Sequence, residues 1–320
     1  MHMSIYKKQF QLKAKADPPM TCNNVKLPLV SVGIPTYNRP EGLRRTLECI
    51  TRQTYSNLEI IVSDNDSPDR ETEVVVREFM AKDSRIKYYR QEENKGITFN
   101  FKFVLELATG EYFMWAADDD VWKLSFISCL VEALEINSDA VLAFCRHDIY
   151  HENRHTGHIE STKDNWSEIT TLSLYNRLFY TYSSLSRISS IRCVYIYGLM
   201  RRDILLKSGG VNWYIEIGGD IIMLYRLLCH GKFVLIDKLL FHSGQRDSLL
   251  GSPSQRLTKR SMNYIHYLIT WHRHYHILRR TVQKTSLNCI QKCVLITMLC
   301  LTEIIFYINS LVRTASFYIR

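Results

Sequence analysis

The stretch from Gly110 to Trp122, GEYFMWAADDDVW, constrains the fold of this chain more than any other. It begins with a turn glycine, continues as an apolar run from Tyr112 to Ala117, and ends in Asp118, Asp119 and Asp120. Such a run is typical of a buried parallel strand, and open α/β sheets bind ligands at the carboxyl ends of their strands. Adjacent carboxylates cost free energy unless a cation or hydrogen-bond donors compensate them. The alternative is a solvated acidic turn, because charge runs usually lie on the surface.

Strands and helices are predicted to alternate through the first half of the chain. Besides the run at Tyr112, apolar segments predict strands at Leu29–Ile34, Leu58–Val62, Ile86–Tyr89 and Ala140–Phe144. Apolar residues at helical spacing predict helices after Pro40, after Ser67, over Phe99–Ala108 and over about Leu124–Leu134. This alternation predicts an α/β fold with a mostly parallel sheet and right-handed crossovers.

The pattern is less regular after Arg146. We predict a helix over Trp166–Arg187, a strand over Val194–Met200, a helix from Gly218 through Leu228, and a short strand over Phe233–Ile236. Polar loops are predicted over His147–Asn165 and Leu240–Gly251. We expect the histidines of the first loop to be solvated and not to bind a metal, because they are spread through a polar segment.

The C-terminal segment is helical in pattern and basic over Tyr264–Arg280. Leu287–Val312 is long enough for a membrane span, but on a helical wheel its polar and aliphatic residues separate. The polar half holds Asn288, Gln291, Lys292, Thr302, Glu303, Asn309, Ser310 and Arg313, breached by Leu295, Leu299 and Phe306; the apolar half holds Ile290, Val294, Leu301, Ile304, Ile308 and Leu311. This pattern favours a helix lying in a bilayer surface. Packing on the protein's own core or on a twin subunit in a homodimer is the alternative.

The composition indicates what kind of partner the chain binds and in which cellular compartment it folds. The formal net charge of +9 points to an anionic partner, which is a nucleic acid, an acidic lipid or a phosphorylated substrate. The nine cysteines form no CxxC pair or zinc-spaced cluster, so we predict reduced thiols in the cytosol. Residues 1–26 carry lysines but no apolar core after them, which predicts a poorly ordered lead-in and no signal peptide.

Three predicted strand ends carry polar groups: Pro35-Thr36-Tyr37-Asn38-Arg39, Asp64-Asn65-Asp66 and Asp118-Asp119-Asp120. Together they offer an aromatic wall for a nucleotide base, a carboxylate for its edge, and carboxylates to hold Mg²⁺ or Mn²⁺ against phosphate oxygens. No GxGxxG follows the first strand and no GxxxxGK[ST] occurs, which argues against a dinucleotide oxidoreductase and a P-loop NTPase.

VSVGIPTYNR, LEIIVSDNDSPD, NKGITFNF and GEYFMWAADDDVW resemble, in order and spacing, the inverting family 2 glycosyltransferases of GT-A fold. The resemblance is close over Leu29–Val141 and looser over Gly198–Ser248. It implies a flexible lead-in at 1–28, a nucleotide-sugar-binding half at 29–146, an acceptor-binding half at 147–253 and a membrane-associating helical appendage at 254–320.

The resemblance implies roles residue by residue. Thr36 and Tyr37, with Pro35, Asn38 and Arg39, would line the nucleoside pocket. Asp64 would accept from the edge of a uracil- or thymine-type base, and Asn65 would also bind the nucleotide. Asn94 and Gly96 would shape the loop beneath the sugar, with Lys95 on a phosphate. The first carboxylate of the family's metal motif is Ala117 here. Asp119 would therefore be the principal ligand of Mn²⁺ or Mg²⁺ and Asp120 its neighbour, with Asp118 at the variable position beside the nucleotide.

The general base implied by the resemblance is Asp220, although a helix N-cap is the alternative role for this residue. His242 and Arg246 would contact the diphosphate. The Gln-x-x-Arg-Trp motif of processive members is missing. We therefore expect transfer of a single sugar from a UDP- or dTDP-type donor to a lipid-linked oligosaccharide.

That reaction would belong to cell-surface polysaccharide synthesis at the cytoplasmic face of the membrane. A catalytically silent nucleotide-binding module is the alternative, supported by Ala117. A nucleic-acid binder is disfavoured, because the basic residues cluster beside an apolar helix and not beside a stacking platform.

Overall fold

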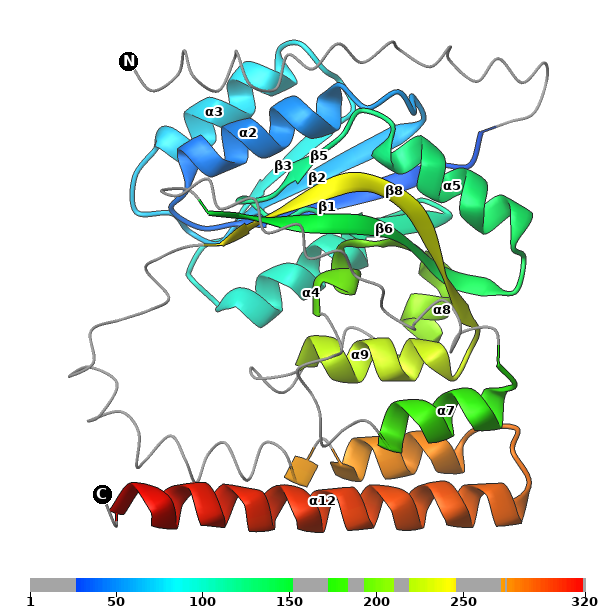
Figure 1. Cartoon of the computed structure of the whole chain (residues 1–320). Coiled ribbons are helices and arrows are strands. Elements are labelled where there is room, and N and C mark those ends of the chain that lie inside the picture. The colour runs from blue at the N-terminus through cyan, green and yellow to red at the C-terminus, as the bar shows by residue number, and fades with distance from the viewer. Residues whose placement is uncertain are drawn as a thin grey trace.

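The computed structural model describes residues 27–151, 172–183, 193–209, 219–245, 272–273 and 275–318. Its centre is an eight-stranded mixed sheet in the order β3-β2-β1-β4-β7-β6-β8-β5 (Figure 1). The strands are β1 Val30–Thr36, β2 Leu58–Asp64, β3 Ile86–Arg90, β4 Tyr112–Trp115, β5 Val121–Trp122, β6 Ala140–His151, β7 Leu199–Arg201 and β8 Lys232–Gln245. The predicted α/β fold is confirmed. The N-terminal lead-in lies outside the described residues.

The first four strands are parallel to one another, as the sequence predicts. Helices α2 Pro40–Thr51, α3 Glu71–Met80 and α5 Phe126–Ile136 cover one face, and α4 Ile97–Leu107 lies on the other (Figure 1). Every residue of β1 and β2 is buried. Cover on both faces explains why these strands read as continuous apolar runs.

Glu59 is a charged residue inside this buried sheet. Its Oε1 accepts hydrogen bonds from the Ser31 hydroxyl, from the amide and hydroxyl of Thr109 and from the Gly110 amide, and its Oε2 lies 3.1 Å from Lys87 Nζ. Burial alone would raise the pKa of Glu59, but these hydrogen bonds lower it to about 2. The carboxylate thus joins β1, β2 and the entry to β4, at the edge opposite their carboxyl ends.

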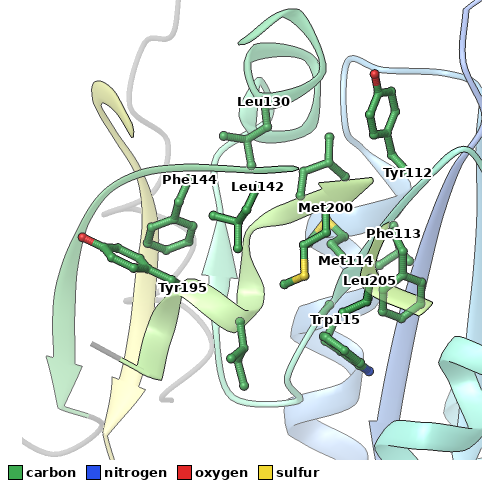
Figure 2. Close-up of a cluster of buried hydrophobic side chains, with 14 of the residues drawn as sticks. Tyr112, Phe113, Met114, Trp115, Leu130, Leu142, Phe144, Tyr195, Met200 and Leu205 are labelled. Atoms are coloured by element: carbon green, nitrogen blue, oxygen red, sulfur yellow. The ribbon is translucent and has the colours of Figure 1, made fainter. Parts of the chain in front are cut away.

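The second half of the sheet differs from the sequence prediction in two places. Residues Cys193–Tyr197, which overlap the strand predicted over Val194–Met200, form a 3-10 helix, η2. In this region Leu199–Arg201 pairs as a strand, antiparallel to both β4 and β6. The Tyr195 ring packs edge-on against Phe144 with centroids 5.1 Å apart, so tertiary packing overrides strand propensity here (Figure 2). Figure 2 shows Tyr195, Phe144, Leu142 and Met200 continuing the cluster around Tyr112–Trp115.

The other difference is the length of the last strands. β8 continues from Lys232 to Gln245 because it pairs in parallel with β6 all the way to His151. The polar loops predicted to begin at His147 and Leu240 were therefore wrong at their starts. The polar side chains of these segments lack the apolar pattern that predicts a strand. The strands form because each segment pairs with a partner almost a hundred residues away in the sequence.

The remaining helices are α7 Leu174–Ser183, α8 Arg202–Lys207, α9 Gly219–Leu228, residues 275–283 and α12 Cys289–Tyr318. The predicted helix at Trp166–Arg187 is described only from Leu174 to Ser183, and the predicted helix to Leu228 is confirmed over its described part. α12 lies along one side of the molecule and packs against α7 (Figure 1). Among the described residues, we find no helix with the length and apolarity that crossing a membrane requires.

Glu59→Gln tests the buried carboxylate. The pKa of Glu59 is depressed in the folded protein from 4.5 to about 2, so its contribution to stability is present above pH 4.5 and is lost as the pH falls toward 2. We expect the variant to lose about 2 kcal/mol of unfolding free energy near neutral pH, and much less near pH 3. Urea denaturation across this range measures it. The exposed Glu92→Gln is the control; equal pH dependence in the two variants would contradict this role.

Candidate active site

The three predicted strand ends meet at one edge of the sheet. Thr36 and Asp64 are register partners at the ends of β1 and β2, and β4 pairs with the other side of β1. The Thr36 hydroxyl donates a 2.9 Å hydrogen bond to Asp118 Oδ2, across 82 residues of sequence. The parallel register therefore brings together the segments that the sequence singled out.

Asp64 is fully buried at the floor of this edge. Its Oδ1 accepts hydrogen bonds from the amide and hydroxyl of Ser67, and its Oδ2 accepts from the Tyr88 hydroxyl and Arg90 Nη1. The Ser67 hydroxyl in turn accepts a 2.8 Å bond from the Asn38 amide. In the structure, Asp64 thus fixes the shape of two turns, and its contact with a base edge stays a prediction.

The loop predicted to lie beneath the sugar adjoins the same edge. Asn65 Nδ2 donates to Asn94 Oδ1 at 2.9 Å, and the Lys95 amide donates to Asn65 Oδ1 at 3.0 Å. The Lys95 ammonium lies 5.1 Å from the Phe99 ring centroid, which keeps this flexible cation at the rim. Gly96 has φ 84°, a conformation that favours glycine and opens α4. Tyr37 is 44% exposed, as an aromatic wall for a base would require.

The acidic turn, Asp118–Asp120, is held by Arg39. Arg39 Nη1 pairs with Asp118 Oδ1 and lies 3.4 Å from Asp119 Oδ2. Of the three carboxylates, Asp118 is the one bound by both Thr36 and Arg39. The solvated-turn alternative is wrong for Asp118 and Asp120, which are 7% and 2% exposed.

Two glycines let neighbouring backbones close on the acidic turn, and sequence reasoning did not find them. A Cβ on Gly42 in α2 would lie 2.0 Å from the Asp118 carbonyl oxygen, and one on Gly244 in β8 would lie 2.2 Å from that of Asp119. The Gly244 amide donates to Asp120 Oδ1 at 2.8 Å. The acidic turn is therefore clamped between the first helix and the last strand.

Burial dominates the electrostatics of the acidic turn. It raises the pKa of Asp118 despite Arg39, and it raises the pKa of Asp119 to about 6. The pKa of Asp120 is raised well above its usual range by burial and then by the charge of Asp119. Asp120 Oδ2 is buried and accepts no hydrogen bond from the described residues. A positive charge delivered here would stabilise the ionised turn.

Asp220 lies in the first turn of α9, which begins at Gly219. A carboxylate at this position also interacts favourably with the helix dipole, whichever chemical role it has. Tyr197, at the end of η2, connects it to the acidic turn: burial raises the pKa of the Tyr197 hydroxyl, and the carboxylates of the acidic turn and of Asp220 raise it further. Both groups of carboxylates therefore act on one tyrosine, which sequence reasoning missed.

His242 lies within β8, opposite Val121 of β5, and not in the loop predicted for it. Its Nδ1 is 2.5 Å from Asp148 Oδ1 on the paired strand β6. Because Gly244, two residues further along β8, contacts the acidic turn, His242 lies near the predicted diphosphate site. Arg246 lies outside the described residues. Asp148 had no signal in the sequence, because the β6–β8 pairing was not predicted beyond Phe144.

Comparison with known proteins decides the family. The model of glycosyl transferase family 2 matches residues 31–207, which is more than half of the chain and includes β1, β2 and the acidic turn. The chain belongs to this family.

Curated relatives of this glycosyltransferase match over shorter segments. The GalNAc(5)-diNAcBac-PP-undecaprenol beta-1,3-glucosyltransferase of Campylobacter jejuni is 36% identical over 33% of this chain and 34% of its own length. The UDP-Glc:alpha-D-GlcNAc-diphosphoundecaprenol beta-1,3-glucosyltransferase WfgD of Escherichia coli is 36% identical over 29% and 36%. The chain thus spans about a third of the length of these relatives.

Solved structures match the glycosyltransferase over most of its length. S. aureus TarS 1–349 in complex with UDP-GlcNAc has a TM-score of 0.60 and 14% identity, over 88% of this chain and 73% of that one. Mannosyltransferase PcManGT from Pyrobaculum calidifontis, in complex with GDP-Man and Mn²⁺, has a TM-score of 0.50 and 16% identity, over 87% and 74%. At these identities the likeness shows the fold alone, which is the predicted GT-A type.

The acidic turn is the predicted binding site for a divalent cation. In the part of the chain that the structure describes, no three or more His, Cys, Asp and Glu side chains form a ready metal site. The acidic turn nevertheless fits a cation in two respects. Asp120 Oδ2 is buried without a hydrogen bond from the described residues, and the charge of Asp119 raises the cost of ionising Asp120. Asp119 and Asp120 are therefore the residues that would hold Mn²⁺ or Mg²⁺.

Arg39→Gln tests the clamp on the acidic turn. Removing the guanidinium leaves Asp118 buried without its counter-charge, so we expect a loss of roughly 2–3 kcal/mol in the free energy of unfolding near neutral pH. Arg44→Gln on the same helix is the matched control, because Arg44 pairs with the exposed Glu78 and its loss is expected to change little. Urea denaturation compares them. Equal losses in the two variants would show that the Arg39–Asp118 pair does not support the turn.

Proposed function

We propose that this glycosyltransferase transfers a single sugar from a UDP- or dTDP-sugar to a lipid-linked oligosaccharide, with inversion at the anomeric carbon. The observation that carries the proposal is the meeting of the acidic turn with the ends of β1 and β2, where Thr36 and Arg39 hold Asp118. The charges of the acidic turn and of Asp220 both act on the Tyr197 hydroxyl, which supports a role for Asp220 at the same site. The Campylobacter and Escherichia relatives, whose names specify undecaprenol-linked acceptors, support the lipid-linked acceptor.

The donor would bind across the ends of β1, β2 and β4. The exposed ring of Tyr37 would cover the base above the turns that Asp64 and Asn38 shape. Pro35 and Thr36 would form the floor below the ribose, and Asn65 would hold the Asn94–Gly96 loop beneath the sugar. Lys95 would meet a phosphate. Among these groups, the sheet register sets the positions of Pro35, Thr36 and Asp64.

In the transfer step, Asp220 would remove the proton from the acceptor hydroxyl as its oxygen attacks the anomeric carbon. The bond between that carbon and the diphosphate oxygen breaks on the opposite face, and the nucleoside diphosphate leaves with the bonding electrons. A divalent cation held by Asp119 and Asp120 would supply charge stabilisation to the leaving diphosphate. His242, oriented by Asp148, would contact the same group, with Arg246 as a further predicted partner.

The proposed cellular role is cell-surface polysaccharide assembly, such as that of O-antigen or capsule, at the cytoplasmic face of the membrane and with one sugar added per encounter. A catalytically silent nucleotide-binding module is the second candidate. It is favoured by Ala117, a buried residue whose side chain has no atom that could bind a metal. The backbone carbonyl of Ala117 accepts a hydrogen bond from the Thr46 hydroxyl. The two candidates differ in turnover and not in nucleotide binding.

Asp220→Asn tests the proposed base. We expect hydrolysis of UDP- and dTDP-sugars, with water as the acceptor, to fall by about 10² or more, while UDP affinity stays within about twofold. The measurement pairs nucleotide-release kinetics with calorimetric titration of UDP. Asp203→Asn on α8 is the control, since Asp203 is an exposed partner of Lys207 and is expected to leave both readouts unchanged.

Hydrolysis of the donor by Asp220→Asn at the wild-type rate would show that Asp220 is not the general base. UDP binding by the wild type, without turnover on any sugar of the panel, would favour the silent module.

A further inference from the structure

The long helix α12 packs on the protein through the half of its surface that carries its polar residues. Leu295 and Leu299 are fully buried, and Thr302 and Glu303 are 6% and 8% exposed. These residues follow one another at helical spacing, so they form one inward face. The leucines that breach the polar half in the helical wheel are therefore its packing contacts.

Glu303 fixes the rotation of α12 about its own axis. Its Oε2 accepts from Arg279 Nη1 at 2.5 Å, and its Oε1 lies 2.7 Å from His272 Nδ1. Both partners belong to the preceding helical segment, which lies on the inner side of α12 (Figure 1). Turning α12 over would break this cluster and expose Leu295 and Leu299. The orientation of its outer face is thus determined by specific contacts.

That outer face is an uncovered apolar stripe. It consists of Ile290, Val294, Leu301, Ile304, Ile305 and Ile308, which are between 39% and 77% exposed. The spacing places all six along one side of the helix over about 27 Å, at 1.5 Å per residue. Single exposed aliphatic residues are ordinary, but a continuous stripe marks an interaction surface.

The charge around the apolar stripe points to what covers it. Residues 272–318 contain Arg273, Arg279, Arg280, Lys284, Lys292 and Arg313, but Glu303 is their only Asp or Glu. Glu303 is directed inward at Arg279 and His272. Arg273, Arg280 and Lys284 are exposed on the segment that packs beside α12. An exposed apolar stripe on a strongly basic segment is complementary to a bilayer that carries anionic lipid.

We propose that the apolar stripe of α12 inserts into the surface of an anionic bilayer, with α12 lying in the membrane plane and the exposed cations of the segment before it attracted to the anionic lipid. This deepens the proposed function, and rests on it in that a lipid-linked acceptor would lie in the same bilayer. The docking itself requires no transfer. A second copy of the chain is the rival occupant, but it would bring two strongly basic surfaces together.

The test is flotation of the full chain with vesicles of equimolar phosphatidylethanolamine and phosphatidylglycerol, and with vesicles of phosphatidylcholine alone. We expect the chain to float with the anionic vesicles and to bind the neutral ones at least tenfold more weakly. The variant Leu301→Asn/Ile304→Asn/Ile308→Asn is expected to lose at least tenfold in anionic-vesicle binding. The matched control is Val74→Asn/Ile136→Asn, which changes exposed apolar residues of α3 and α5 and is expected to bind as the wild type does.

Circular dichroism and urea midpoints check that the variants fold; if the triple variant is unfolded, Ile304→Asn alone is compared with Ile136→Asn. Absence of wild-type flotation, or unchanged flotation of the stripe variant, would overturn the proposal. So would a lipid-free dimer by sedimentation that the stripe variant dissociates. Donor hydrolysis in water separates this proposal from the function: its absence in the wild type contradicts the proposed enzyme and leaves the vesicle result standing.

Discussion

The contact of Thr36 and Arg39 with Asp118 is the interaction on which the rest of the site depends. It joins the end of β1 to the turn after β4, and through the β1–β2 register it aligns both with Asp64. The contact is costly in isolation, because Asp118 is buried and burial raises its pKa. It persists because the backbones of α2 and β8 close on the acidic turn at Gly42 and Gly244. The fold therefore concentrates negative charge where open α/β sheets bind ligands.

The same clamp links the two halves of the molecule. β8 contacts the acidic turn through Gly244, carries His242, and pairs along its whole length with β6, which carries Asp148. The charges of the acidic turn and of Asp220 both act on the Tyr197 hydroxyl. A displacement of the acidic turn would therefore be felt in both halves of the molecule.

The elements whose structure depends on neighbouring residues in the sequence were predicted correctly. The apolar runs of β1, β2 and β4 and the turn residues after them gave the parallel half of the sheet and the meeting of Thr36, Asp64 and Asp118. Contacts made by distant pairing had no local signal: β8 was cut short at Ile236, and Asp148, Tyr197 and Gly244 were missed. The helical wheel separated the two halves of α12. The burial of Leu295 and Leu299 and the contacts of Glu303 with Arg279 and His272 show which half faces the protein.

The central claim is that the acidic turn holds the cation that binds the donor's diphosphate, and calorimetric titration of UDP with and without Mn²⁺ tests it most directly. For the wild type, the account predicts that Mn²⁺ strengthens UDP binding at least about tenfold, or roughly 1.4 kcal/mol. Asp119→Ala is predicted to lose this gain. UDP affinity that is independent of Mn²⁺ in the wild type, or a full Mn²⁺ effect in Asp119→Ala, would contradict the account.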